Sequence, residues 1–194
     1  MKDFLKTIEE ASPALAGYIH AVFGREPVEL YSPLSPEECT TRLNAAMDRP
    51  LWRSVSFSQI FGSRPVIGSV DDETVTLRKR IRYRNSFQTF LSAKMEPHGA
   101  GTIIRGELAM HPWVRAFIPF WLGGVVLFCV AGVIFTLFSE SFLPLLMIPL
   151  MCGAMFLFGV AGVYFGRYVA RDEAGFLMDF LRQTAGVEEK KISN

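Results

Sequence analysis

Charged residues are almost absent from one long stretch of this chain. Between Ala116 and Phe165 only Glu140 carries a charge, although charged residues make up 20% of the sequence. A bilayer's hydrocarbon core is about 30 Å thick and a helix rises about 1.5 Å per residue, so a spanning helix needs roughly 20 apolar residues. The segments on either side of Ser139-Glu140-Ser141 are each slightly longer than that. Residues 113–168 are therefore predicted to form a transmembrane helical hairpin.

Cysteine and histidine are scarce, with three of each. The cysteines are odd in number and two of them lie in the apolar segments, so neither a disulfide framework nor a thiolate zinc site fits. We interpret Cys39, Cys129 and Cys152 as small apolar fillers. His20, His98 and His111 are scattered without metal-ligand spacing, and no glycine-rich phosphate loop occurs. The sequence predicts no metal and no cofactor.

No motif identifies a reaction. Two chemical alternatives stay open, a nucleophilic pair of Cys39 with a histidine and a catalytic or metal-binding role for the acidic run Asp71-Asp72-Glu73. Cys39 falls on the predicted buried stripe of a helix, where thiols are usually inert. The acidic run is typical of a turn. The apolar segments hold no buried charge of the kind that marks a transport path. We therefore expect a non-enzymatic protein, with a membrane-bound enzyme acting on a lipid-linked substrate as the weaker alternative.

The flanks of the hairpin predict its orientation. The amino-terminal MKDFLKTIEEASP has scattered charges and lacks the compact apolar core and cleavage site of a secretory signal. Arg105 and Arg115 precede the first span, Arg167 and Arg171 follow the second, and the connector 139–141 has no Lys or Arg. Positive residues stay on the cytoplasmic side. The sequence predicts a protein of the cell (inner) membrane with two spans and both termini in the cytoplasm.

Residues 27–112 are predicted to form a cytoplasmic α+β domain. Short connections between successive strands predict an antiparallel meander. Ser35-Pro36-Glu37-Glu38 forms a capping box with proline at the first helical position, so a helix is expected from Pro36 to about Met47. That helix should cover one sheet face, because a bare sheet of this size would leave apolar residues exposed. The expected strands are 29–32, 66–70, 73–83, 87–96 and 102–110, with a loop at 97–101.

Two helical segments flank these parts. Residues 1–26 predict an N-terminal helical segment in which Ser12 is an N-cap, Pro13 begins a helix and Gly24 ends it. Its apolar face either packs on the β-domain or a partner, or lies in the membrane interface. The shortage of basic residues favours packing. Residues 169–194 predict an amphipathic helix that ends at Gly186, followed by a frayed tail.

Small residues recur in pairs along the two apolar segments. Gly162 and Gly166 also have the GxxxG spacing, which lets helix backbones approach closely. We expect these glycines to serve helix packing, either within the hairpin or in a homo-oligomer. A larger membrane complex with this chain as a subunit is the corresponding alternative function.

Four arginines alternate along the strand expected at 73–83 and just beyond it. Residues two apart share a strand face, so these side chains should form one row over roughly 20 Å. The row is either a solvated face paired with carboxylates such as Glu96 and Glu107, or a surface that contacts anions. At the cytoplasmic leaflet the nearest anions are lipid headgroups. Nucleic acid is not expected, because no recognised fold motif is present and aromatic residues do not interleave with the basic ones. The candidate residues are Arg78, Arg80, Arg82 and Arg84.

The order of these features resembles a group of small bacterial membrane proteins. The resemblance rests on Val66-Ile67-Gly68, on Tyr83-Arg84-Asn85-Ser86-Phe87 and on Gly101-Thr102, followed by a membrane hairpin. It covers roughly residues 35–125. It implies a cytoplasmic β-rich domain followed by a transmembrane helical hairpin, and it implies no activity or functional residue.

Overall fold

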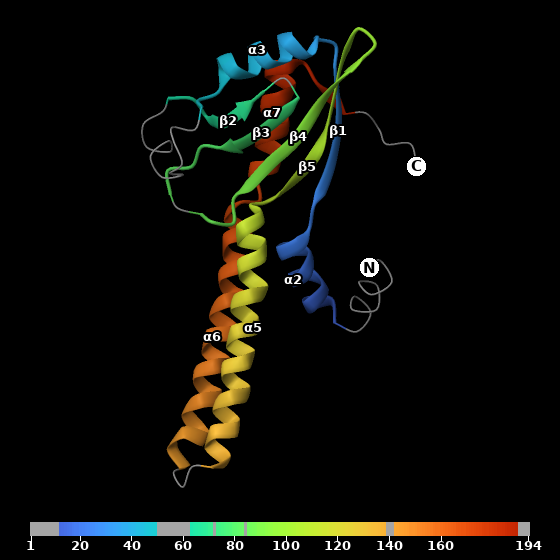
Figure 1. The fold of residues 1–194 in the computed structure, drawn as a ribbon. Helices are drawn as coiled ribbons and strands as arrows, with labels where there is room; N and C mark the ends of the chain where they lie inside the picture. Colours follow the sequence, from blue (N-terminus) through green and yellow to red (C-terminus); the bar gives the residue numbers. More distant parts are fainter. Residues whose placement is uncertain (1–11, 50–62, 72, 84, 139–141, 190–194) are drawn as a thin grey trace. The chain divides into compact units, whose positions relative to one another are not determined.

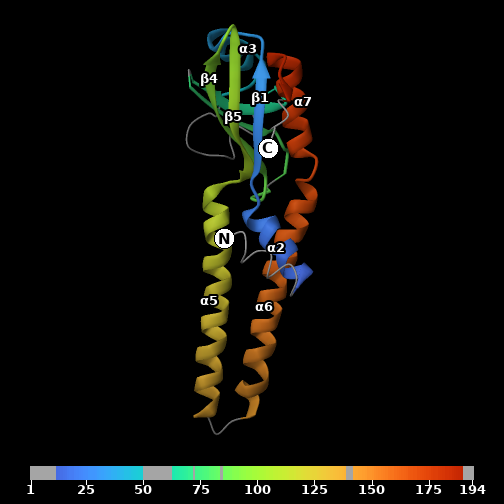
Figure 2. The same ribbon diagram turned by 90° about the vertical axis from the view of Figure 1, so that its right-hand side faces the viewer.

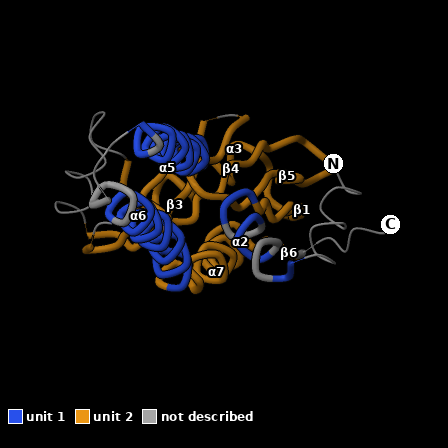
Figure 3. The backbone as a smooth tube through the Cα atoms, turned by 90° about the horizontal axis from the view of Figure 1, so that it is seen from below, with its two compact units in different colours: residues 1–23, 112–168 blue, residues 24–111, 169–194 orange. Residues whose placement is uncertain are grey.

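The chain passes three times between two structural units, at residues 23/24, 111/112 and 168/169 (Figure 1). In the computed structural model the described residues are 12–49, 63–71, 73–83, 85–138 and 142–189. One unit consists of Met1–Phe23 with Pro112–Tyr168, and the other of Gly24–His111 with Val169–Asn194, as the two colours of Figure 3 show. The first is the hairpin unit and the second the α+β unit.

The α+β unit is built on a six-stranded antiparallel sheet with the order β2-β3-β4-β5-β1-β6. The predicted α+β class and the meander of four consecutive strands are confirmed. The first strand of the chain pairs along the outer edge of β5, from Glu26 opposite Leu108 to Ser32 opposite Thr102. The strands are β1 (Glu26–Ser32), β2 (Val66–Val70), β3 (Thr74–Lys79), β4 (Thr89–His98), β5 (Gly101–Met110) and β6 (Glu188–Glu189).

Several strand boundaries differ from the prediction: β1 begins at Glu26 rather than Glu29, and β4 runs over Thr89–His98 rather than 87–96. β3 ends at Lys79 rather than Tyr83, because its ladder with β2 stops where Val66 pairs with Lys79. Pro65 comes next on that side and has no amide hydrogen with which to continue the ladder. The loop expected at 97–101 is also wrong. β4 and β5 pair as far as His98 and Gly101, leaving a tight turn in which Gly99 has φ of 60°.

Helix α3 (Pro36–Ala46) begins as the sequence predicted. The amide of Glu38 donates to Ser35 Oγ over 3.3 Å, and the amide of Ser35 donates to Glu38 Oε2 over 3.4 Å. This reciprocal capping box satisfies two amides that lack a partner within the helix. Cys39 and Leu43 on its inner face are fully buried.

Helix α7 (Glu173–Ala185) completes the core of the α+β unit (Figure 2). The sequence treated 169–194 as a separate C-terminal segment, but α7 contacts α3, β3 and β4. Its inner residues Leu177, Leu181 and Ala185 are each 0% exposed and join the same apolar cluster as Leu30 and Leu43. Gly186, in the left-handed conformation with φ of 61°, ends the helix as expected.

The hairpin unit consists of α2 (Pro13–Phe23), α5 (Pro112–Leu137) and α6 (Phe142–Val169). Both α5 and α6 are long and apolar enough to cross a membrane. Their large side chains are largely uncovered by protein, as Phe120 (79% exposed) and Phe158 (77% exposed) illustrate. α2 contacts α5, and the Tyr18 ring lies 5.9 Å from that of Tyr164 on α6. α2 therefore packs within the hairpin unit.

Removing one buried α7 side chain should destabilise the α+β unit. We expect Leu177→Ala to lower the free energy of unfolding by about 2–5 kcal/mol, because it leaves a cavity in the shared core. Denaturant titration of the full chain in detergent, read by proteolysis of the α+β unit, measures the change. Gln183→Ala, on the exposed side of the same helix, is the matched control and should change it by less than about 0.5 kcal/mol. Equal effects of the two variants would contradict a core role for α7.

Candidate functional site

Arg78, the first of the predicted arginine row, is buried. Its side chain leaves the sheet on the face opposite Leu77, and the residue is only 7% exposed. The guanidinium carbon lies 5.9 Å from the centre of the Phe90 ring on the neighbouring strand. Burial, followed by the nearby positive charge of Arg80, lowers the pKa of Arg78. A guanidinium in this position stabilises the sheet through a cation–π contact and is not displayed to a partner.

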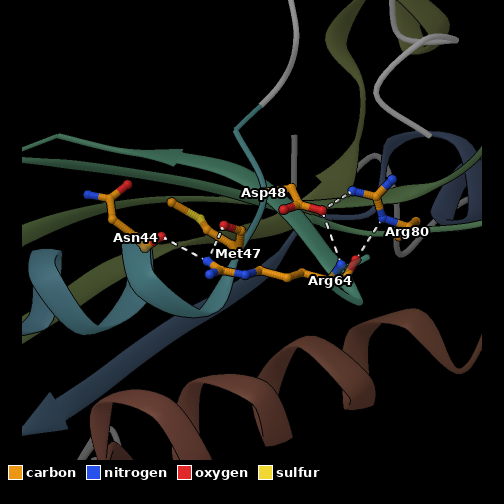
Figure 4. Close-up of polar contacts among 5 residues, drawn as sticks. All are labelled: Asn44, Met47, Asp48, Arg64 and Arg80. Carbon is orange, nitrogen blue, oxygen red and sulfur yellow. Dashed lines mark hydrogen bonds and ion pairs between the residues drawn. The ribbon is translucent and has the colours of Figure 1, made fainter. Parts of the chain in front are cut away.

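Arg80 belongs to a polar network that joins the end of α3 to the end of β3 (Figure 4). Its Nη2 lies 2.5 Å from Asp48 Oδ2, and its Nε donates to the carbonyl of Arg64 over 2.6 Å. The Arg80 side chain is 10% exposed and that of Asp48 is 28% exposed. A charge-assisted pair with this degree of burial holds its partners more firmly than a surface pair does.

Arg64 completes the network from the other side. Its Nη1 donates to the carbonyls of Met47 (2.9 Å) and Asn44 (3.3 Å), the last turn of α3, while its amide donates to Asp48 Oδ2 over 3.1 Å. A cation at a helix C-terminus satisfies carbonyls that have no partner within the helix. Asp48 and Arg64 flank residues 49–63, so the network holds the two ends of that segment together.

The prediction that four arginines form one row on a strand face is therefore wrong, because only Arg78 lies in the strand. β3 ends at Lys79, so Arg80 and Arg82 follow the strand, and Arg84 lies outside the described residues. Arg82 is exposed in a bend, beside the 47% exposed Tyr83. Of the candidate residues that the structure describes, Arg82 alone keeps the exposed side chain that contact with anions requires.

The carboxylates expected to neutralise the row have other partners. Glu107 binds Arg25 over 2.9 Å, and Glu96 binds Arg105 over 3.2 Å. Arg105 also reaches Glu29 across β5 and β1 at 3.2 Å. These exposed pairs form a charge-balanced outer face on the central strands, and pairs of this kind contribute little to stability.

Glu173 is a buried acid that sequence reasoning missed. It is 2% exposed at the first position of α7, and its Oε2 accepts from the Thr89 amide on β4 over 2.7 Å. Partial burial and the nearby Glu173 carboxylate together raise the pKa of Tyr83. An acidic residue in the first turn of a helix is favoured by the helix dipole. The position of Glu173 in the first turn was the only feature of the sequence that could have singled it out. The tertiary contact with β4 is what shows that its carboxylate is buried.

Among the residues that the structure describes, the groups proposed for chemistry lie on separate elements, and Asp72 lies outside those residues. The Cys39 thiol donates to Ser32 Oγ over 3.4 Å inside the core, and Ser32 donates in turn to the carbonyl of Ala185 over 2.5 Å. The His98 ring stacks edge-on against Tyr31 at 6.4 Å. Tyr31 and Ser32 are consecutive in β1, so the sheet separates His98 from the thiol. Asp71 forms the β2–β3 turn, its amide donating to Thr74 O over 2.9 Å.

Two close contacts of the hairpin occur at glycines outside the predicted pair. A Cβ added to Gly132 would overlap Ile148, and one added to Gly159 would overlap the Trp121 ring. A Cβ added to Gly162 would meet nothing within 4 Å, and Gly166 is buried within α6. Gly162 instead lines a pocket of about 280 Å³ between α2, α5 and α6. Whether Gly162 and Gly166 serve self-association stays a prediction.

Comparisons with protein-family models, with curated proteins and with solved structures find no match to this chain.

The Arg80–Asp48 pair should stabilise the fold more than a surface pair. We expect a double-mutant cycle with Arg80→Gln and Asp48→Asn to give a coupling of about 1–3 kcal/mol, because both partners are partly buried and charge-assisted. The matched cycle at the exposed Arg105–Glu96 pair should give less than about 1 kcal/mol. Denaturant titration of the full chain measures both cycles. A coupling at Arg80–Asp48 no larger than the surface value would overturn the structural role given to this network.

Proposed function

We propose that this chain is a two-span protein of the cell membrane whose α+β unit is a non-enzymatic binding module on the cytoplasmic side. Its partner there is an anionic lipid headgroup or another protein. The alternative is a subunit of a larger membrane complex. An enzyme acting on a lipid-linked substrate is less well supported, because the candidate catalytic groups that the structure describes lie on separate elements or inside the core.

The position of the hairpin within the chain is the observation that carries this proposal. The hairpin is inserted between β5, which ends at Met110, and α7, which begins at Glu173. β5 and α7 both belong to the α+β unit. A membrane crossed by α5 must therefore be crossed back by α6, because otherwise α7 could not reach its place beside β3 and β4. The shared core thus supports an even number of crossings, independently of any rule on charge.

Charge then supports the cytoplasmic side for the α+β unit. Arg115 lies in the first turn of α5 and Arg167 in the last turn of α6, at the ends that lead to this unit. The connector between the spans carries no Lys or Arg. This asymmetry favours retention of the α+β unit in the cytoplasm.

Chain length keeps the proposed module near headgroups. One residue, His111, separates β5 from α5, and Ala170 to Asp172 separate α6 from α7. A residue spans at most about 3.6 Å, so neither connection is a long tether. The exposed Arg82 is the basic residue that we assign to contact with anions, since Arg78 and Arg80 are engaged inside the fold.

The orientation is tested by labelling from outside intact cells with a membrane-impermeant maleimide. Phe138 directly follows α5 and is 85% exposed, so Phe138→Cys should be labelled. Lys94→Cys, on the exposed face of β4, should not be labelled. Inverted membrane vesicles should reverse the result, because the proposed cytoplasmic face is then outside. The parent chain, with its own three cysteines, sets the background. Labelling of Lys94→Cys in intact cells would place the α+β unit on the wrong side and reject the proposal.

Contact with headgroups is tested by hydrogen exchange of the full chain in lipid nanodiscs. Residues 80–88 should exchange more slowly in discs rich in anionic phospholipid than in zwitterionic discs, and Arg82→Glu should remove the difference, because one basic side chain near an anionic surface contributes about 1 kcal/mol. Arg42→Glu, a charge reversal at an exposed position of α3, is the control and should preserve it. Equal exchange in both kinds of disc would rule out the headgroup version and leave a protein partner.

A further inference from the structure

Three helices of the hairpin unit surround an apolar pocket of about 280 Å³. Four of its nine lining residues are aromatic: Tyr18 from α2, Phe117 and Trp121 from α5, and Phe158 from α6. Trp121 is held in place because its ring packs against Gly159. The volume is close to the lower limit of about 300 Å³ for pockets that bind small molecules.

Glycine creates this space. Gly162 lines the pocket, and a Cβ added there would meet no atom within 4 Å. Atoms that line an unfilled apolar space lose their dispersion contacts on that side. In a bilayer the material available to fill such a space is a lipid acyl chain, which is as apolar as the lining.

A cation lies one helical turn from the pocket. Arg115 precedes Ile118 and Leu122 by three and seven residues on α5, so the three share a helix face, and the latter two line the pocket. The Arg115 Nε is buried and has no hydrogen-bond partner among the described residues. On α6, Arg167 follows the pocket residue Val163 by one turn, at the same end of the antiparallel pair.

A second polar atom is at the pocket itself. The Tyr18 hydroxyl is buried and, in the part of the chain that the structure describes, no group accepts or donates a hydrogen bond to it. A buried donor without a partner costs about 1–3 kcal/mol, so a ligand that accepts hydrogen bonds from Tyr18 and Arg115 removes that penalty. Phosphate suits arginine especially, since it can accept two parallel hydrogen bonds from one guanidinium.

We propose that this pocket binds one anionic phospholipid of the surrounding bilayer. One acyl chain fills the space beside Gly162 and Trp121, and the headgroup phosphate accepts hydrogen bonds from Arg115 and Tyr18. Basic pockets between membrane helices on the cytoplasmic side are suited to such headgroups. The inference rests on the proposed membrane-spanning hairpin, but it assigns a lipid site separate from Arg82 and from the α+β unit.

Fluorescence quenching of Trp121 tests the site. The other two tryptophans are replaced, as Trp52→Phe and Trp113→Phe, and the full chain is reconstituted in bilayers containing brominated phosphatidylglycerol or brominated phosphatidylcholine. Quenching as a function of the brominated fraction gives the relative binding constant of the two lipids at Trp121. One favourable arginine contact predicts about a fivefold preference for the anionic lipid.

Two variants probe the two halves of the site. Arg115→Gln keeps the apolar pocket and should bring the preference close to one. Gly162→Leu fills the pocket and should also abolish the preference for the anionic lipid. Gly153→Leu is the matched control, because Gly153 lies on the same helix with equal space around it and does not line the pocket. It should keep the fivefold preference.

The outcomes separate this inference from the proposed function. Equal quenching by both lipids in the parent chain, or an unchanged preference in Arg115→Gln and Gly162→Leu, would overturn the lipid site and leave the two-span topology intact. Absence of quenching by either lipid would show that Trp121 is not in the bilayer. That result would reject the membrane-spanning hairpin together with the site that depends on it.

Discussion

Burial of α7 against the sheet is the constraint on which the remaining structure depends. Leu177, Leu181 and Ala185 are fully buried and share one apolar cluster with α3 and the central strands. Since the hairpin separates α7 from β5 along the chain, the core closes only after both apolar helices have been made. The hairpin is therefore an insertion within the α+β unit, and its two ends are tied to the same folded body.

The arginines of residues 78–82 differ in how far each side chain is removed from water, and this difference gives them different roles. Arg78 is covered beside Phe90, and Arg80 is held between Asp48 and the carbonyl of Arg64. Burying a guanidinium is unfavourable unless it gains partners, and each of these two has them. Arg82, in a bend without such surroundings, stays at the surface. Of the three arginines of this row that the structure describes, two are therefore engaged inside the fold and one is exposed.

The glycines of the hairpin likewise divide into two kinds. Gly132 and Gly159 allow the opposite helix to approach, because a side chain at either position would overlap Ile148 or Trp121. Gly162 faces open space and helps to form the pocket beside α2. Glycines of the same helix therefore have different roles: Gly159 allows close packing of the two helices, and Gly162 leaves space for the pocket. The difference arises from which face of the helix meets a partner.

Local and periodic signals were sufficient for much of the architecture. The apolar runs predicted two long helices, the Ser35 capping box predicted where α3 begins, and alternating strands with short turns predicted the meander. Each depends on interactions within a few residues, so the sequence determines it directly. The end of β3 depended on Pro65, which immediately precedes the neighbouring strand β2. The environments of Arg78, Arg80 and Glu173 depended on residues far away in the chain. Burial of a charge is decided by what packs over it, and only the tertiary structure brings Phe90, Asp48 and Thr89 to those side chains.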